Sequence, residues 1–128
     1  MAYHLMIVDD SPTMRRVIRK TVTLSGIPVE ECWEAGDGRE ALEILRGHPI
    51  NLILTDINMP RMNGLEMLKE MQKEEVWRKI PVVLITSLDN QEHFRETSVC
   101  GVKGYLQKPF RPEALRDLLS RMEEENRV

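Results

Sequence analysis

Short apolar runs alternate with segments of helical periodicity along the whole chain. The apolar runs cover residues 4–8, 29–35, 50–55, 80–85 and 103–106, and each has the length of a strand. Between them, apolar residues recur three and four positions apart, which is the spacing of one helix face. This spacing predicts helices over residues 14–22, 39–46, 64–75, 89–100 and 111–124, of which 89–100 has the weakest pattern.

The alternation of strand and helix predicts an α/β fold with a doubly wound parallel sheet. Residues 4–8 and 80–85 are nearly continuous apolar runs, which is typical of strands that are buried on both faces. Residues 29–35 are less apolar, so we place this strand at an edge of the sheet. Right-handed crossovers through the helices would cover both faces. A chain of 128 residues is expected to form a single domain over residues 1–128.

Composition excludes several classes of protein. The chain has 18 Lys and Arg against 21 Asp and Glu, and a net charge of −3 argues against a general nucleic-acid or anionic-membrane binder. No apolar run approaches the roughly 20 residues of a membrane span, and the N-terminus does not resemble a secretory signal. Cys32 and Cys100 are too few for a disulfide framework, which favours a reducing, cytoplasmic setting.

Polar side chains with related chemistry follow the predicted strands. Ligands of open α/β sheets bind beyond the carboxyl ends of the strands. The residues that reach this edge are Asp9 and Asp10 after the first strand, Asp56 after the third, Thr86 and Ser87 after the fourth, and Lys108 after the fifth. Ordinary solvated loops would also be polar, but they do not predict three carboxylates and one amine.

These groups predict a site for phosphoryl transfer. Three neighbouring carboxylates repel one another unless some are protonated or a cation neutralises them, and Mg²⁺ prefers such oxygen ligands. Lys108 adds a positive charge of the kind that binds phosphate, and Thr86 adds a hydroxyl donor. Phosphoryl transfer depends mainly on positioning and charge neutralisation, and a carboxylate can itself accept the group as an acyl phosphate.

The same residues resemble the motifs of response-regulator receiver domains over essentially the full length. The matching pieces are Asp9-Asp10, Asp56-Ile57-Asn58-Met59-Pro60 with Gly64, Thr86-Ser87, and Lys108-Pro109-Phe110. Each piece alone is weak, but all four occur in order at the ends of successive predicted strands. The segment Asp10-Ser11-Pro12-Thr13-Met14-Arg15-Arg16 is similar to single-domain chemotaxis receivers of the CheY type. Asn90 and Gln91 depart from the lysines that such receivers often carry there, which leaves a flagellar-motor target open.

The resemblance implies a fold and a set of residue roles. The fold is flavodoxin-like, with five helices and the strand order 2-1-3-4-5, for which CheY is a known example. Asp56 would be the phosphorylated residue. Mg²⁺ would bind Asp10, Asp56 and the backbone carbonyl of Asn58, with Asp9 acting through water. The phosphoryl group would be bound by Lys108, Thr86 and Ser87. The Lys108–Pro109 peptide bond would be cis, which is affordable for an X–Pro bond.

The resemblance also implies a switch and its partners. Phosphorylation would draw Thr86 inward, and Tyr105 would turn from an exposed to a buried position. The face formed by residues 89–100, 103–106 and 111–124 would then change its affinity for a downstream protein. The phosphoryl donor would be a sensor histidine kinase or a histidine phosphotransfer protein. The chain would be a monomer that catalyses only its own phosphorylation and dephosphorylation, rather than an enzyme acting on other substrates.

Three alternatives remain open. A Mg²⁺-dependent phosphatase with an aspartyl nucleophile usually has a second Asp two residues later as acid and base, and this chain has Asn58 there. The chain could also be a receiver from a larger regulator, or an intermediate of a phosphorelay. By themselves, Asp9 and Asp10 fit a helix cap and its neighbour, and Tyr105 fits core packing equally well.

Overall fold

The described part of the chain contains one five-stranded parallel sheet. The structure, a computed structural model, describes residues 2–86 and 100–125. Its strands are β1 Tyr3–Val8, β2 Val29–Ala35, β3 Leu52–Thr55, β4 Val82–Thr86 and β5 Val102–Gln107. Their order is β2-β1-β3-β4-β5, and each neighbouring pair is parallel. The α/β class and the order 2-1-3-4-5 are therefore confirmed.

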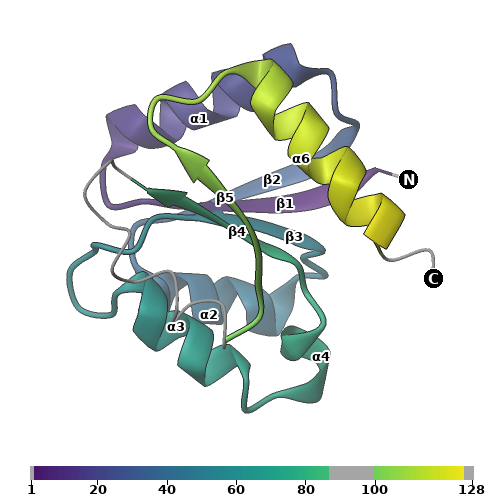
Figure 1. Cartoon of the computed structure of the whole chain (residues 1–128). Helices are drawn as coiled ribbons and strands as arrows, with labels where there is room; N and C mark the ends of the chain where they lie inside the picture. The colour runs from purple at the N-terminus through teal and green to yellow at the C-terminus, as the bar shows by residue number, and fades with distance from the viewer. Residues whose placement is uncertain (1, 87–99, 126–128) are drawn as a thin grey trace.

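Helices cover the sheet on both faces (Figure 1). The described helices are α1 Pro12–Ser25, α2 Gly38–Gly47, α3 Gly64–Met71, α4 Glu75–Arg78 and α6 Pro112–Glu125. Helices α1 and α6 lie on one face of the sheet, whereas α2 and α3 lie on the other. None of the described helices is long and apolar enough to span a lipid bilayer.

Burial on both faces explains the continuous apolar runs. Every residue of β3 and β4 is buried. Neighbouring residues of a strand point to opposite faces. Leu5 accordingly packs with the α1 and α6 side chains, and Met6 packs with those of α2 and α3. Strand β2 pairs only with β1 in the described residues, and its exposed positions include Glu30, Glu31 and Glu34.

Local hydrogen bonds set the boundaries of α1. The Ser11 hydroxyl accepts a hydrogen bond from the Met14 N–H at 3.1 Å, Pro12 occupies the first turn, and Gly26 ends the helix with a φ of +78°. These are the caps that the sequence predicts. The helical spacing of apolar residues predicts Val17 on the buried face of this helix, but its exposed fraction is 51%. It lies at the margin of that face, because Ile18 and Val22 fill the contact with the sheet.

Several predicted boundaries were wrong. The helix expected over residues 64–75 ends at Met71, and the separate short helix α4 follows. The Lys73 N–H donates to the Glu70 carbonyl, three residues back, so the chain tightens into a turn instead of continuing the α-helix. Strand β4 begins at Val82 because Pro81 has no N–H for the ladder. The helix expected over residues 89–100 lies outside the described residues except for Cys100.

The carboxylate of Glu34 joins the edge strand β2 to α1. It accepts hydrogen bonds from Arg15 Nε at 2.9 Å and from Arg19 Nη2 at 2.8 Å. Burial opposes ionisation of Glu34, but the hydrogen bonds and positive charges of the two arginines outweigh it and lower the pKa of Glu34. The ionised carboxylate therefore stabilises the folded state above its unfolded pKa of about 4.3, and this stabilisation is lost as the pH falls through the lower folded pKa.

We expect Glu34→Gln to lower the free energy of unfolding by about 0.5–1 kcal/mol at pH 7, since the pair is partly exposed. Urea denaturation between pH 7 and pH 3 measures this difference, which should shrink as the solution becomes acidic. Glu43→Gln, at an exposed position of α2, is the matched control and should have no comparable effect. A Glu34→Gln deficit that is independent of pH would contradict the assigned role of the charge.

Candidate functional site

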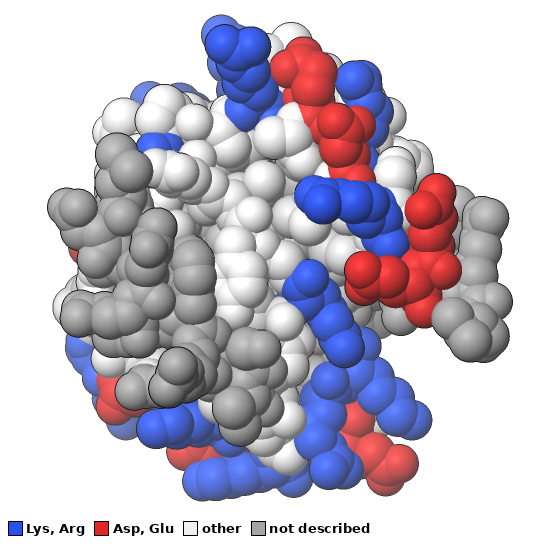
Figure 2. Space-filling view, in the orientation of Figure 1, with Lys and Arg blue, Asp and Glu red and all other residues white. Residues whose placement is uncertain are grey.

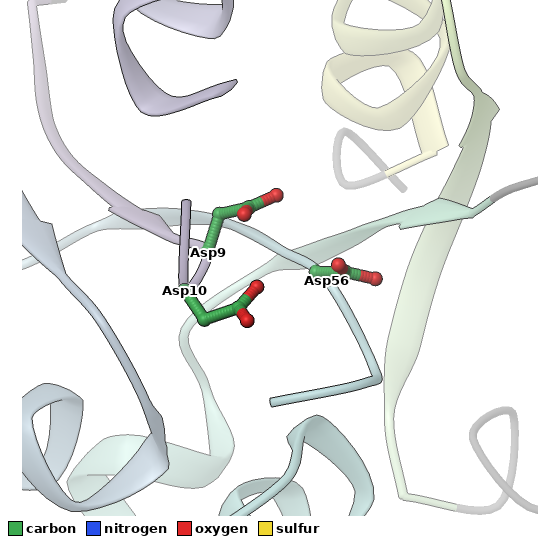
Figure 3. A group of neighbouring side chains, drawn as sticks. All are labelled: Asp9, Asp10 and Asp56. Atoms are coloured by element: carbon green, nitrogen blue, oxygen red, sulfur yellow. The ribbon is translucent and has the colours of Figure 1, made fainter. Parts of the chain in front are cut away.

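Three carboxylates meet at the carboxyl edge of the sheet. The adjacent strands β1 and β3 are in register, with Val8 opposite Thr55, so the residues that follow them are neighbours. Asp9 and Asp10 extend from the end of β1 and Asp56 from the end of β3, as Figure 3 shows. One carboxylate oxygen from each lies within 4.8 Å of the others. The convergence predicted for these three residues is therefore present.

Backbone amides hold the two less exposed carboxylates in place. Asp9 is only 2% exposed, and its Oδ1 accepts a hydrogen bond from the Ser11 N–H at 2.9 Å. Asp56 Oδ1 accepts one from the Ile57 N–H at 2.7 Å. Asp10, in contrast, is an exposed residue. Each of the anchored carboxylates thus keeps its Oδ2 oxygen for the centre of the site.

Lys108 bridges those two remaining oxygens. Its Nζ lies 3.1 Å from Asp9 Oδ2 and 3.1 Å from Asp56 Oδ2. The Lys108 N–H donates to the Thr86 carbonyl at 2.7 Å, which fixes the chain beyond β5 against β4. The peptide bond from Lys108 to Pro109 is cis, as the resemblance implied. Partial burial opposes the charge, but the carboxylates of Asp56 and Asp9 outweigh it and raise the pKa of Lys108.

The donor set suits a hard divalent cation. Among the described residues, three carboxylates converge with one ammonium, so the ammonium compensates only part of their negative charge. The converging atoms are oxygens, which Mg²⁺ and Ca²⁺ prefer to nitrogen or sulfur ligands. The exposed position of Asp10 leaves the group open to water, which Mg²⁺ usually retains in its coordination shell. The residues present therefore fit a magnesium site.

The other predicted site residues lie on neighbouring elements. Thr86 is 4% exposed at the end of β4, and Asn58 is exposed in the loop after β3. Tyr105 is half-buried on β5, opposite Leu84 of β4, and packs against the core. Ser87 lies outside the described residues. The roles of Asn58, Thr86 and Tyr105 remain predictions.

Two residues near the site were missed as contributors. The basic run of α1 predicts a solvated position for Arg15, but its Nη1 donates to the Asp9 carbonyl at 2.5 Å while its Nε binds Glu34. Asp37 lies between two glycines, a pattern that predicts a simple turn, but it is a fully buried carboxylate that caps α2 through a 2.9 Å hydrogen bond from the Glu40 N–H. The first contact joins α1 to Asp9 of the acidic group, and the second fixes the start of α2.

The geometry supports reaction at Asp56. Its side chain is 13% exposed, so a small donor can reach it, and an ammonium lies within contact distance. A carboxylate in this position can attack phosphorus, and the neighbouring Lys108 ammonium can neutralise part of the charge of the transferred group.

Comparison with known proteins agrees with this arrangement. The family model described as the response regulator receiver domain matches residues 5–120. Chemotaxis protein CheY1 of Helicobacter pylori is 38% identical over 116 residues, which cover 90% of this chain and 92% of that protein. The structure of the chemotaxis response regulator CheY4 of Vibrio cholerae is 32% identical, with a TM-score of 0.80 over 94% of this chain and 98% of that one. A receiver domain of a signal transduction histidine kinase from Syntrophus aciditrophicus is 26% identical, with a TM-score of 0.82 over 98% of this chain and 93% of that one.

Proposed function

Because this chain belongs to the response regulator receiver family, and is thus a protein of two-component signalling, we propose that it is switched by phosphorylation of Asp56. The observation that supports this choice is the position of the Asp56 carboxylate, which is reachable from solvent and lies among Asp9, Asp10 and the Lys108 ammonium. We extend the receiver domain to residues 1–128 and assign it to the cytoplasm, where its kinase would act.

The proposed reaction transfers a phosphoryl group between two nucleophiles. An oxygen of Asp56 attacks phosphorus, the bond from phosphorus to the donor breaks, and the donor leaves with the electron pair. Asp10, Asp56 and the Asn58 carbonyl would hold Mg²⁺ directly, with Asp9 supporting it. When bound, the ion supplies charge neutralisation for the phosphoryl oxygens. Lys108 keeps its positive charge at neutral pH and pairs with the same oxygens.

In the proposed switch, the phosphoryl group on Asp56 changes the packing of residues on β4 and β5. The phosphoryl group carries about 1.5 to 2 negative charges, which replace the single charge of the carboxylate, and it brings strong acceptor oxygens to which the Thr86 hydroxyl donates. Tyr105 follows by repacking on β5. A shift from 1:99 to 99:1 needs about 5.5 kcal/mol, and a few charge-assisted hydrogen bonds at about 1.5–3 kcal/mol each supply it.

The proposed output surface includes β5 and α6. Figure 2 shows a largely uncharged strip over β5, with charged side chains along its right-hand side. Such a surface suits a protein partner better than a nucleic acid. The donor would be a sensor histidine kinase or a histidine phosphotransfer protein. A pull-down with and without beryllofluoride, which mimics the phosphoryl group, would identify proteins that bind only the activated form.

The similarity to a receiver domain of a histidine kinase supports a second candidate role, as a phosphorelay intermediate. A relay protein would pass the phosphoryl group from Asp56 to a histidine phosphotransfer protein. A terminal switch would lose it to water. The phosphatase alternative has a separate test, because turnover of phosphomonoesters would support it.

We expect phosphorylation to require the divalent cation. Incubation with a small phosphodonor and Mg²⁺ should give one acid-labile phosphate per chain, measured by intact-protein mass spectrometry. EDTA should abolish the uptake, because repulsion between the carboxylates and the incoming phosphoryl group is then uncompensated. Restoring Mg²⁺ in excess should restore it. Equal uptake in EDTA would exclude the proposed metal dependence.

A further inference from the structure

Two contacts attach the loop between β3 and α3 to the N-terminus of α2. The Gly38 N–H donates to the Met62 carbonyl at 2.8 Å. One residue earlier on each segment, Arg61 Nη2 lies 2.6 Å from Asp37 Oδ2. The approach is close, since a Cβ atom on Gly38 would lie 2.7 Å from Met62 Cγ. The two segments therefore form one packed unit.

Asp37 gives this attachment its charge. Its side chain is 0% exposed, and Oδ1 is used by the helix cap. Oδ2 has no aligned hydrogen bond in the described residues, so its contact with Arg61 is an ion pair. A buried carboxylate is unfavourable unless an opposite charge compensates it, and the Arg61 guanidinium supplies that charge.

The backbone of Arg61 is unusual. Its φ of 63° is the only positive value at a non-glycine position in the described residues. Glycine or asparagine adopts this conformation at lower cost, and an arginine is expected there only where other contacts hold it. The contact with Asp37 is such an interaction.

The same loop carries the proposed site. Its first residue is Asp56, whose Oδ1 accepts from the Ile57 N–H. The Ile57 carbonyl accepts from the Gly64 N–H at 2.7 Å, which closes the loop at its other end. Asn58 lies between these points. A shift of Arg61 would therefore change a closed loop that also orients the Asp56 carboxylate.

We propose that Asp37 and Arg61 form a positioning pair, which holds the β3–α3 loop so that Asp56 and the Asn58 carbonyl are in place for Mg²⁺. This role presupposes the proposed function of Asp56. Neither residue touches the reacting atoms. Asp37 anchors Arg61 to α2, and Arg61 fixes the loop from outside the acidic cluster.

The test uses Arg61→Asn, which tolerates the positive φ but removes the charge, and Arg61→Lys, which keeps the charge. Lys73→Gln is the matched control, because it removes the exposed 2.9 Å pair of Lys73 with Glu70 at the far end of α3. Titration calorimetry measures Mg²⁺ affinity. Hydrogen exchange in the metal-free protein measures protection of the Ile57 and Gly38 amides.

We expect Arg61→Asn to weaken Mg²⁺ binding by about 2- to 30-fold and to accelerate exchange of both amides. Arg61→Lys should recover most of both effects, and Lys73→Gln should change neither. Asp37→Asn keeps an acceptor for the helix cap and should add little to Arg61→Asn in the double variant. If Asp37→Asn does not fold, the Arg61 variants alone test the positioning role.

Unchanged Mg²⁺ affinity and unchanged amide exchange in Arg61→Asn would overturn the positioning role. A loss of unfolding free energy without those two changes would also overturn it, because it would show a purely structural ion pair. Failure of the wild-type protein to accept phosphate would instead refute the proposed function. Hydrogen exchange in the metal-free protein would still test whether Arg61 holds the β3–α3 loop against α2.

Discussion

Asp56→Asn is expected to abolish uptake of acid-labile phosphate, with a loss of more than about 10³-fold in rate. An amide oxygen is a far weaker nucleophile than a carboxylate, and an amide cannot form the acyl phosphate. The substitution is nearly isosteric, and its oxygen can still accept the hydrogen bond that Ile57 donates to Asp56 Oδ1. Intact-protein mass spectrometry after incubation with a small phosphodonor and Mg²⁺ measures the result.

Two controls separate loss of the acceptor from loss of charge. Asp10→Asn removes a neighbouring carboxylate but keeps the nucleophile, so its uptake should be slower and should recover at high Mg²⁺. Asp117→Asn, at an exposed position of α6, should behave as wild type. Undiminished labelling of Asp56→Asn would refute the assignment and would direct attention to Asp9 or Asp10.

Gly64→Ala is expected to lower the free energy of unfolding by about 3 kcal/mol and to slow phosphorylation. A Cβ atom at Gly64 would overlap the Asp56 carbonyl oxygen and lie 3.0 Å from Ile57 Cα. Both neighbours are backbone atoms, so the clash is relieved only if the loop that orients Asp56 moves. Urea denaturation measures the stability, and the phosphodonor assay measures the rate.

Gly47→Ala is the matched substitution. Gly47 is the last residue of α2, and a Cβ there has no atom within 4 Å. Alanine at this position should be neutral or stabilising by up to about 1 kcal/mol. If both variants lost the same stability, the cause would be a general effect of the added methyl group rather than the close approach of α3 to Asp56.

The sheet and the centre of the site were predictable because their signals are local. Strands buried on both faces leave continuous apolar runs, as β3 and β4 show. Parallel strands end at a common edge, so Asp56 and Lys108 could be placed there before their contact was known. The strand order came from the resemblance to receiver domains, since the hydrophobic pattern alone does not distinguish it from other parallel orders.

The supporting contacts were not predictable because they depend on distant partners. Asp37 and Arg61 are separated by 24 positions in the chain, and an Asp between two glycines is typical of a turn. Arg15 belongs to a basic run that predicts a solvated face, and only the fold reveals the Asp9 carbonyl beside it. The break between α3 and α4 was missed for another reason, since residues 72–75 contain neither a glycine nor a proline that would mark the end of a helix.

The acidic residues of β2 also affect how the molecule behaves at high concentration. A strand that pairs on one side only presents free backbone groups to which a strand of another molecule can add. Along this edge lie the exposed carboxylates of Glu30 and Glu31, so two copies that met edge to edge would bring like charges together. Electrostatic repulsion thus protects the sheet from growing into aggregates, without any covering helix at that edge in the described residues.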